Sequence, residues 1–308
     1  MKIAMNPLHD LFSATRGKTI AVAALVIALI TPHGRTQDVF AQDAQDAPTP
    51  DKGRYTLFNP VPVRMMRELS PDRPDKTESP YTVDAGHFQL EMDFANFTYD
   101  NSGGMVTQTW NMAPFNVKVG LLNNTDLQLV FDDYLFSQTK DNVTRTVTRK
   151  YGVGDLTLRL KLNLWGDDQG TTALGILPFV KMPTNTGGLG NNAVEGGTIV
   201  PLAVKLPADV DMGCETAVLV LRNENGAGYH GDFVNSITFD HRLFRALSGY
   251  VEFFSDISGQ AHAGWIGTVD AGLELAVADN LQFDCGCNFG VTDAADQYNP
   301  FAGVSIRF

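Results

Sequence analysis

The sequence has few cysteines and no long hydrophobic run. Cys214, Cys285 and Cys287 are odd in number, which excludes a fully paired disulfide framework. Cys285 and Cys287 lie two apart within an apolar alternation and are interpreted as small hydrophobic residues, because no cluster of His and no second Cys pair accompanies them as a metal site would require. The longest apolar run, residues 20–30, is shorter than the roughly 20 residues of a transmembrane helix, so no helical span is expected.

Basic residues are also scarce. The chain has 23 Lys and Arg against 35 Asp and Glu, a net charge of -12, which argues against a nucleic-acid partner because phosphates need a basic face. Beyond residue 41 the only histidines are His87, His230, His241 and His262.

No catalytic motif stands out in the sequence. The histidines are dispersed, and no GxSxG, HExxH or CxxC pattern surrounds them. Ser236, His241 and Arg242 share one predicted strand and come nearest to the Ser–His arrangement of an outer-membrane phospholipase, but they lack its signature. We therefore expect no enzyme, no cofactor and no metal.

The N-terminus predicts export. Lys2, Arg16 and Lys18 precede the apolar run 20–30, and Val39-Phe40-Ala41 then provides a small-residue cleavage site, so residues 1–41 are expected to be a cleaved signal peptide. Residues 42–83 are rich in Pro, Asp and Gln and predict an N-terminal arm that is either disordered or inserted into the lumen of a barrel. In the second case Arg73, Asp75 and Glu78 would meet charges on the wall and act as a plug.

From residue 84 to 308 the pattern predicts an all-β domain. Leu156, Leu158, Leu160, Leu162 and Leu164 alternate with polar residues, and similar alternation recurs at 87–97 and 269–277. In a secreted soluble β-sandwich the aliphatic face would form the core, whereas in a membrane barrel it faces lipid and the charged face lines the lumen. Alternation alone leaves both alternatives open.

The connections between strands favour the barrel. Twelve strands (range 10–14) are expected, at about 86–98, 105–121, 127–136, 153–165, 171–182, 198–206, 212–222, 232–243, 248–256, 264–277, 281–291 and 299–308. Tight turns alternate with connections that are mostly longer, at Ser137–Gly152, Thr184–Gly197, Asn223–Gly231 and Ile257–Ala263. This is typical of a transmembrane up-and-down antiparallel β-barrel, whose short turns face the periplasm.

The chain ends on an apolar alternating strand, Tyr298–Phe308, in which Val304, Ile306 and Phe308 share one face. This ending resembles the assembly signal of outer-membrane β-barrels. It implies the barrel-assembly machinery and outer-membrane lipid as partners, and a last strand that pairs with the first to remove the open edge.

Three segments resemble a known family. Residues 72–91 (DRPDKTESPYTVDAGHFQLE), 152–161 (GVGDLTLRLK) and 177–184 (LPFVKMPT) are similar to motifs of the outer-membrane transporters named for the MetA pathway of phenol degradation, and the resemblance spans roughly residues 72–308. Lys76 departs from the family pattern, which has an apolar residue there. The resemblance implies an outer-membrane β-barrel that handles small hydrophobic or aromatic solutes.

Charged residues that oppose the apolar stripes are candidates for the lumen lining: Glu91, Asp93, Arg159, Lys161, Asp240, Arg242, Glu252, Asp270 and Glu274. They would either pair across the lumen and hold the barrel rigid or form a polar lining that selects solutes. The leading hypothesis is an outer-membrane channel for passive uptake of small solutes. The alternative is a structural or surface-binding outer-membrane barrel with a plugged lumen.

Overall fold

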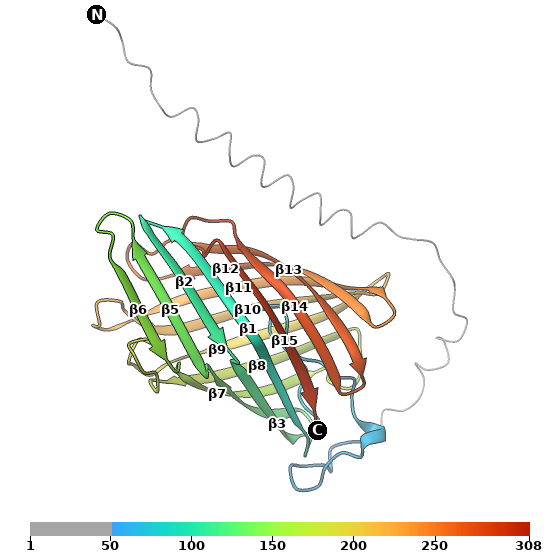
Figure 1. The fold of residues 1–308 in the computed structure, drawn as a ribbon. Coiled ribbons are helices and arrows are strands. Elements are labelled where there is room, and N and C mark those ends of the chain that lie inside the picture. Colours follow the sequence, from blue (N-terminus) through green and yellow to red (C-terminus); the bar gives the residue numbers. More distant parts are fainter. Residues whose placement is uncertain (1–50) are drawn as a thin grey trace, which may run out of the picture. The chain divides into compact units, whose positions relative to one another are not determined.

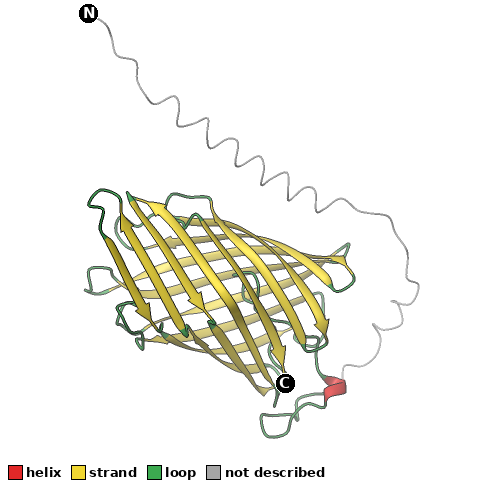
Figure 2. Ribbon diagram, viewed as in Figure 1, coloured by secondary structure: helices red, strands yellow, loops and turns green. Residues whose placement is uncertain are grey.

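The computed structural model describes residues 51–308, which form a closed antiparallel β-barrel and one short 3-10 helix (Figures 1 and 2). The elements are η2 (Val63–Met65), β1 (Phe88–Ser102), β2 (Met105–Met112), β3 (Phe115–Leu122), β4 (Thr125–Phe131), β5 (Tyr134–Asp141), β6 (Val147–Gly152), β7 (Leu156–Trp165), β8 (Thr172–Met182), β9 (Glu195–Leu206), β10 (Val210–Arg222), β11 (Tyr229–Phe244), β12 (Leu247–Ser258), β13 (Ile266–Ala278), β14 (Leu281–Gly290) and β15 (Tyr298–Arg307). The predicted signal peptide and residues 42–50 of the predicted arm lie outside the described residues.

The fifteen segments make twelve strands of the wall, because three wall strands are interrupted. β1 pairs with β3 over Phe88–Met92 and with β2 over Asn96–Ser102, so β2 and β3 follow one another along the same neighbour. β4 and β5 continue this arrangement, as do β6 and β7. β15 pairs with β1 and closes the barrel. The predicted antiparallel barrel of about twelve strands is confirmed.

The three interruptions lie side by side in the wall. Ala113 and Pro114 separate β2 from β3, where Ala113 has a positive φ of 53° and Pro114 has no N–H for the ladder. Asp132 lies in the next interruption and connects to both neighbours: its carboxylate accepts a hydrogen bond from Asn111 at 2.7 Å and its carbonyl accepts one from Gly154 at 2.9 Å. Side chains and irregular backbone therefore replace the sheet ladder across this line.

One predicted loop was wrong. Residues 137–152 were expected to form a long connection, but β5 extends to Asp141 and β6 begins at Val147, so a hairpin occupies the range. The segment is polar on both faces, and most of β6 is exposed, so apolar alternation could not indicate the hairpin. The hairpin forms through backbone pairing of β5 with β6. β6 pairs with β5 on one edge, and no other described strand pairs with its second edge, whereas β7 pairs on both sides.

The two ends of the barrel differ. β3–β4, β9–β10, β11–β12 and β13–β14 are joined by tight turns at one end, where β1 begins and β15 finishes beside the arm (Figure 1). This end is called the short-turn end and the opposite one the loop end. The backbone of Phe308 exchanges hydrogen bonds with that of Phe88, at 2.8 and 3.2 Å, and this contact completes the seam between the last and first strands.

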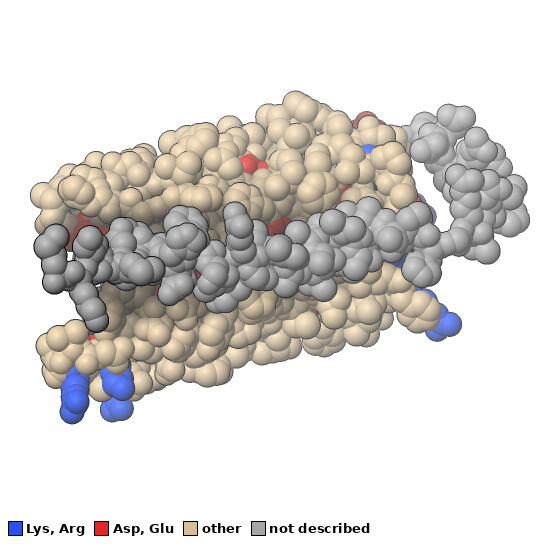
Figure 3. Space-filling view, turned by 90° about the horizontal axis from the view of Figure 1, so that it is seen from above, with Lys and Arg blue, Asp and Glu red and all other residues tan. Residues whose placement is uncertain are grey.

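The outer wall is apolar and the inner wall is polar. Leu158, Leu164, Leu273 and Phe283 are among the exposed large hydrophobic residues, and the visible part of the wall in Figure 3 has few charged groups. The inward neighbours of such residues are buried polar side chains, as Lys161 illustrates within β7. A soluble sandwich would bury the aliphatic faces, so this arrangement is that of a barrel in lipid. Within residues 51–308, no helix is long and apolar enough to cross a membrane.

The cysteines lie in this wall as free thiols. Cys285 is exposed and Cys287 is half-buried, and both alternate with inward residues of β14. Asp284, which lies between Phe283 and Cys285, points the other way and is buried. The two thiols therefore share the apolar outer face of this strand.

Candidate functional site

The arm is anchored at the short-turn end before it enters the lumen. Tyr55, Val61 and Ala85 form a small buried apolar cluster with Met65 and Met66 packed against it. The backbone N–H of Leu57 donates to the carbonyl of Leu121 at the end of β3, at 2.8 Å. These contacts fix the two ends of the segment that lies between them, because Ala85 lies three residues before the start of β1 at Phe88.

Residues 72–78, called the plug, contact the wall on several sides. On the first side the carboxylate of Asp72 lies 2.5 Å from the ammonium groups of both Lys118 and Lys161. The two lysine side chains are 2% and 0% exposed, and Lys118 also pairs with Glu91. Unpaired charges at such depth are strongly unfavourable, so Asp72 neutralises cations that the wall alone leaves incompletely paired.

Arg73 connects two wall strands on the next side. Its guanidinium lies 2.5 Å from Asp93 of β1 and 2.5 Å from Asp284 of β14. It also lies over the ring of Phe301 at 5.8 Å. A Cβ atom on Gly303 would come within 2.2 Å of the guanidinium, so glycine at this position is what lets the arginine pass so close to β15.

Lys76 and Thr77 contact β11, β12 and β13. The ammonium of Lys76 lies 3.1 Å from Asp270, and it donates to the Thr268 hydroxyl at 2.8 Å. The backbone N–H groups of Lys76 and Thr77 donate to the carboxylate of Glu252 at 3.0 and 2.8 Å. Charge-assisted hydrogen bonds of this kind are stronger than neutral ones, and they place the plug backbone against this side of the wall.

Glu78 completes the set by pairing with Arg159 of β7, while its backbone N–H donates to Glu215 of β10 at 2.7 Å. Asp75 is the exception in the plug, because its carboxyl lies among Glu252, Glu274 and Thr238 and makes no ion pair with any residue of 51–308. The plug as a whole contacts β1, β3, β7 and β10–β14, and so crosses the lumen.

The sequence-predicted residues fall into two groups. Glu91, Asp93, Arg159, Lys161, Glu252 and Asp270 line the lumen and contact the plug, which itself contains Arg73, Asp75 and Glu78. The other three candidates make no ion pair within residues 51–308: Glu274 accepts a hydrogen bond from Gln282 at 3.2 Å, Asp240 is half-buried and Arg242 is exposed near a turn. Val304 and Ile306 are half-buried on the outward side of β15, and Phe308 is exposed.

Sequence reasoning missed four charged contact residues: Lys76, Lys118, Glu215 and Asp284. Lys118 and Asp284 obey the same alternation as the residues that were found, since each opposes an apolar stripe in its own strand. Glu215 likewise points inward, whereas its neighbours Cys214 and Thr216 in the same strand point outward. The alternation of inward and outward residues could therefore have indicated the three wall residues, whereas Lys76 lies in the arm, which has no periodicity that could indicate it.

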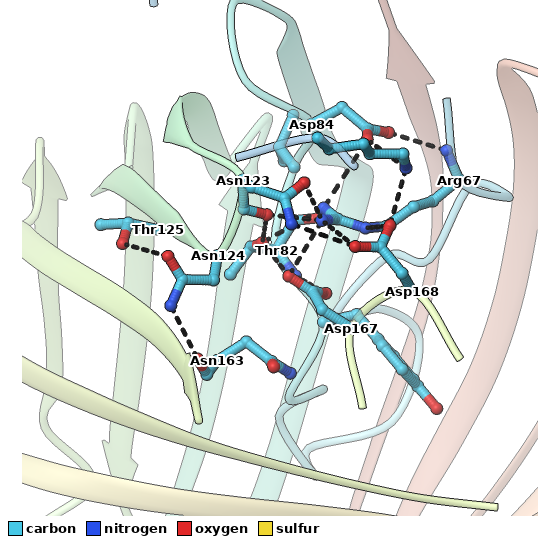
Figure 4. A network of polar contacts seen from close by, with 12 residues as sticks. Arg67, Thr82, Asp84, Asn123, Asn124, Thr125, Asn163, Asp167 and Asp168 are labelled. Atoms are coloured by element: carbon cyan, nitrogen blue, oxygen red, sulfur yellow. Dashed lines mark hydrogen bonds and ion pairs between the residues drawn. The ribbon is translucent and has the colours of Figure 1, made fainter. Parts of the chain in front are cut away.

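A second network, called the latch, fixes the arm at the short-turn end (Figure 4). It joins Lys52, Arg67 and Asp84 to Asn123, Asp167 and Asp168 in the β3–β4 and β7–β8 turns. Arg67 lies 3.0 Å from Asp168 and 3.3 Å from Asp167, and it donates to the side chain of Asn123 at 2.8 Å. Lys52 lies 2.7 Å from Asp168 and 3.2 Å from Asp84.

The two turn carboxyls of the latch have opposite electrostatics. Burial raises the pKa of Asp167 to about 6, against the opposing effects of Arg67 and of hydrogen bonds from Thr82. Burial also acts on Asp168, but hydrogen bonds from Lys52, Asn123 and Arg67 outweigh it and lower the pKa to about 2. The latch therefore holds Asp168 as an anion and favours a proton on Asp167.

Two further features adjoin the plug. A cavity of about 600 Å³ lies at the short-turn end and is lined by the latch residues Arg67, Asp167 and Asp168 with wall residues that include Arg307. Toward the loop end, four buried apolar side chains form a row across β8–β11, called the apolar row: Leu177, Ile199, Ala217 and Val234. Phe179, Leu219 and Phe254 pack against it.

The apolar row lies directly beyond the residues that hold the plug. Ala217 is the next inward position after Glu215 on β10, and Val234 is the next inward position beyond Ser236 on β11. Glu215 and Ser236 both bond to the plug. A buried apolar cluster therefore adjoins the loop-end side of the plug, and the half-buried side chains Phe179, Leu219 and Phe254 pack against it.

A closed barrel that is apolar outside and charged inside, with its lumen crossed by its own arm, defines an integral outer-membrane β-barrel. The chain belongs to the family described as "Putative MetA-pathway of phenol degradation", whose model matches residues 71–308. No curated protein matches the chain.

One solved outer-membrane channel is similar in fold. The COG4313 outer membrane channel from Pseudomonas putida F1 has a TM-score of 0.54 and 12% identity, over 78% of this chain and 100% of that one. The beta domain of the Bordetella autotransporter BrkA has a TM-score of 0.47 and 11% identity, over 72% of this chain and 99% of that one. At 12% identity, the first likeness concerns the fold.

Proposed function

We propose that this protein is an outer-membrane channel through which small hydrophobic or aromatic solutes diffuse passively, with the plug as its gate. Passage involves no covalent chemistry and no cofactor. The observation that carries the proposal is the apolar row together with the half-buried Phe179, Leu219 and Phe254 that pack against it, because a lumen built only to be rigid has no need of contiguous apolar side chains beside its plug. The family description and the name of the first similar channel support the same reading.

The route follows from the geometry. A solute enters from the loop end and contacts Phe179, Leu219 and Phe254, the half-buried side chains that pack against the apolar row, where the burial of its apolar surface is favourable. Displacement of the plug then joins this surface to the cavity of about 600 Å³ at the short-turn end, which leads to the periplasm. Outer-membrane lipid covers the apolar outer wall, and the barrel-assembly machinery recognises the strand that ends in Val304, Ile306 and Phe308.

A second candidate is a structural or surface-binding barrel whose plug never moves. It is favoured by the number of ion pairs that hold the plug, since Asp72, Arg73, Lys76 and Glu78 are all paired with the wall. A gate and a permanent plug differ in their response to weakening of these pairs.

Liposome swelling tests the proposal. Liposomes that contain the full chain are exposed to phenol-class solutes and to sugars of similar mass, and single-channel conductance is recorded in planar bilayers. We expect phenolic solutes to enter faster than sugars, and deletion of residues 54–80 to raise the conductance. A barrel that passes no solute, and whose conductance is the same after the deletion, would support the permanent plug instead.

A further inference from the structure

The charges of the lumen wall are unevenly distributed. The buried acidic residues of the strands are Glu91, Asp93, Asp126, Glu195, Glu215, Asp232, Glu252, Asp270 and Asp284, and the buried basic ones are Lys118, Lys161 and Arg307. Among the described residues of β10–β14, every buried charged side chain is acidic. This side of the lumen, comprising Glu215, Asp232, Glu252, Asp270 and Asp284, is called the acidic wall.

The plug supplies hydrogen-bond donors and cations to the acidic wall. Glu215 and Glu252 accept hydrogen bonds from backbone N–H groups of the plug. Asp284 forms an ion pair with Arg73, and Asp270 forms one with Lys76. A displaced plug takes these donors with it. The wall then carries carboxylates without partners in a water-filled lumen, and such a field concentrates mobile cations and repels anions.

One position in the acidic wall has the chemistry of an ammonium site. The Lys76 ammonium lies 3.1 Å from Asp270, 2.8 Å from the Thr268 hydroxyl and 4.6 Å from the centre of the Phe254 ring. It therefore combines an ion pair, a hydrogen bond and a cation–π contact, which together recognise an organic ammonium group.

The site is accessible and incompletely satisfied. The Lys76 side chain is 30% exposed, whereas Asp270 beneath it is 0% exposed. Within the described residues, the Asp270 Oδ1 atom has no hydrogen-bond partner. The Tyr250 hydroxyl, which is buried among Asp75, Glu252 and Asp270, has none either. The Asp270 Oδ1 atom can therefore accept a hydrogen bond in addition to the contacts that Lys76 and Thr268 make with Oδ2.

Resting on the proposed function, we propose that Asp270, Thr268 and Phe254 form a binding site for the ammonium group of a small organic cation, which Lys76 occupies in the plugged state. Phe254 also packs against the apolar row, so an ammonium group at Asp270 places an attached apolar group beside Phe254 and the β11 end of that row. The preferred solutes carry both parts, as aryl-alkylammonium compounds do. The acidic wall disfavours carboxylates of the same size.

Three probes of nearly equal size test the charge preference: benzylammonium, benzyl alcohol and benzoate. Flux into liposomes that contain the full chain is expected to be at least roughly tenfold faster for benzylammonium than for benzoate. Equal flux of all three probes, or faster benzoate flux, overturns the ammonium site and leaves the channel intact. Entry of none of the three overturns the proposed function itself.

Binding to the detergent-solubilised full chain, measured by titration calorimetry, tests the residues. Lys76→Met removes the internal occupant and is expected to tighten benzylammonium binding roughly tenfold, since a competing cation is lost. Phe254→Leu in the Lys76→Met background is expected to lose this gain, and Asp270→Asn to abolish binding. Asp133→Asn removes an exposed carboxylate outside the acidic wall and serves as the matched control.

Heat-modifiable migration on detergent gels shows that each variant is folded before titration. If Asp270→Asn does not fold, Phe254→Leu keeps the test decisive, because its change is neutral and conservative in size. Equal affinity of the wild type and Lys76→Met for benzylammonium overturns the site, as does equal loss of binding in Asp133→Asn.

Discussion

Neutralisation of Asp72 is predicted to release the plug. Asp72→Asn leaves Lys161 without an ion pair among residues 51–308, whereas Lys118 keeps Glu91. Removal of one partner of a buried pair costs about 3–5 kcal/mol, and the lower value applies because one lysine keeps a partner. About 3 kcal/mol corresponds to a roughly hundredfold fall in the ratio of docked to undocked plug.

The assay is single-channel recording in planar bilayers, with trypsin cleavage of the arm as a second measure. We expect the open fraction of Asp72→Asn to exceed that of the wild type by up to two orders of magnitude, and the arm to become cleavable. Asp75→Asn is the matched control: it removes the same charge from the same segment, but Asp75 lies beside Glu252 and Glu274. Loss of that repulsion favours docking, so its open fraction should be equal to or below that of the wild type.

The reasoning would be refuted by two results. In the first, Asp72→Asn has wild-type conductance and a protected arm, which would mean that the buried pairs do not control docking. In the second, Asp72→Asn and Asp75→Asn open the channel equally, which would mean that any loss of charge in the arm has the same effect.

Three further predictions concern the latch and the wall. The pKa of Asp167 rises from 3.8 to about 6 in the docked state, so protonation of Asp167 favours docking. This contribution of about 3 kcal/mol to docking is lost as the pH rises from about 4 to 6. Asp168 titrates below that range. The open fraction should be larger at pH 7 than at pH 5, and Asp167→Asn should flatten the profile; a profile that this variant leaves unchanged would contradict the assignment. Leu158→Arg places a charge on the outer wall and should cost about 2–4 kcal/mol if the position is near the bilayer midplane, measured by urea titration of folding into vesicles, with no loss expected if that face is not in lipid. Deletion of Phe308 should slow assembly, measured as the folded fraction on detergent gels over time, and an unchanged rate would argue against a role for the C-terminal residue.

Alternation predicted the wall well because in a barrel each strand is constrained by two different solvents. Leu158 and Arg159 illustrate this, because Leu158 faces lipid and must be apolar, whereas Arg159 faces the polar lumen. Apolar and polar residues therefore alternate along the strand with a period of two. The same rule would have included Lys118 and Asp284. It could not predict β6, because a strand with both faces in water has no apolar stripe.

The course of the arm could not be predicted for a different reason. Asp72 contacts Lys118 and Lys161, which are far from it in sequence. Their side chains come together around Asp72 only when the barrel has closed and the arm lies in its lumen. The charge density of the arm indicated that pairing with the wall was feasible, but the choice of partners depends on three-dimensional register. Pro114 and Gly154, by contrast, could have indicated the interruptions of the strands from sequence, but the alternation continues on both sides of each residue and favoured unbroken strands.

The line of interruptions across β2–β3, β4–β5 and β6–β7 divides this part of the wall into two panels. The panel nearer the short-turn end holds Lys118 and Lys161, and the plug ties it to the rest of the barrel. The other panel, β2, β5 and β6, ends in an exposed strand that is paired along one edge. Its amide protons should exchange with solvent sooner than those of β3, β4 and β7, by local opening that leaves the barrel folded. The barrel is thus rigid where the plug is seated and deformable where solutes first arrive.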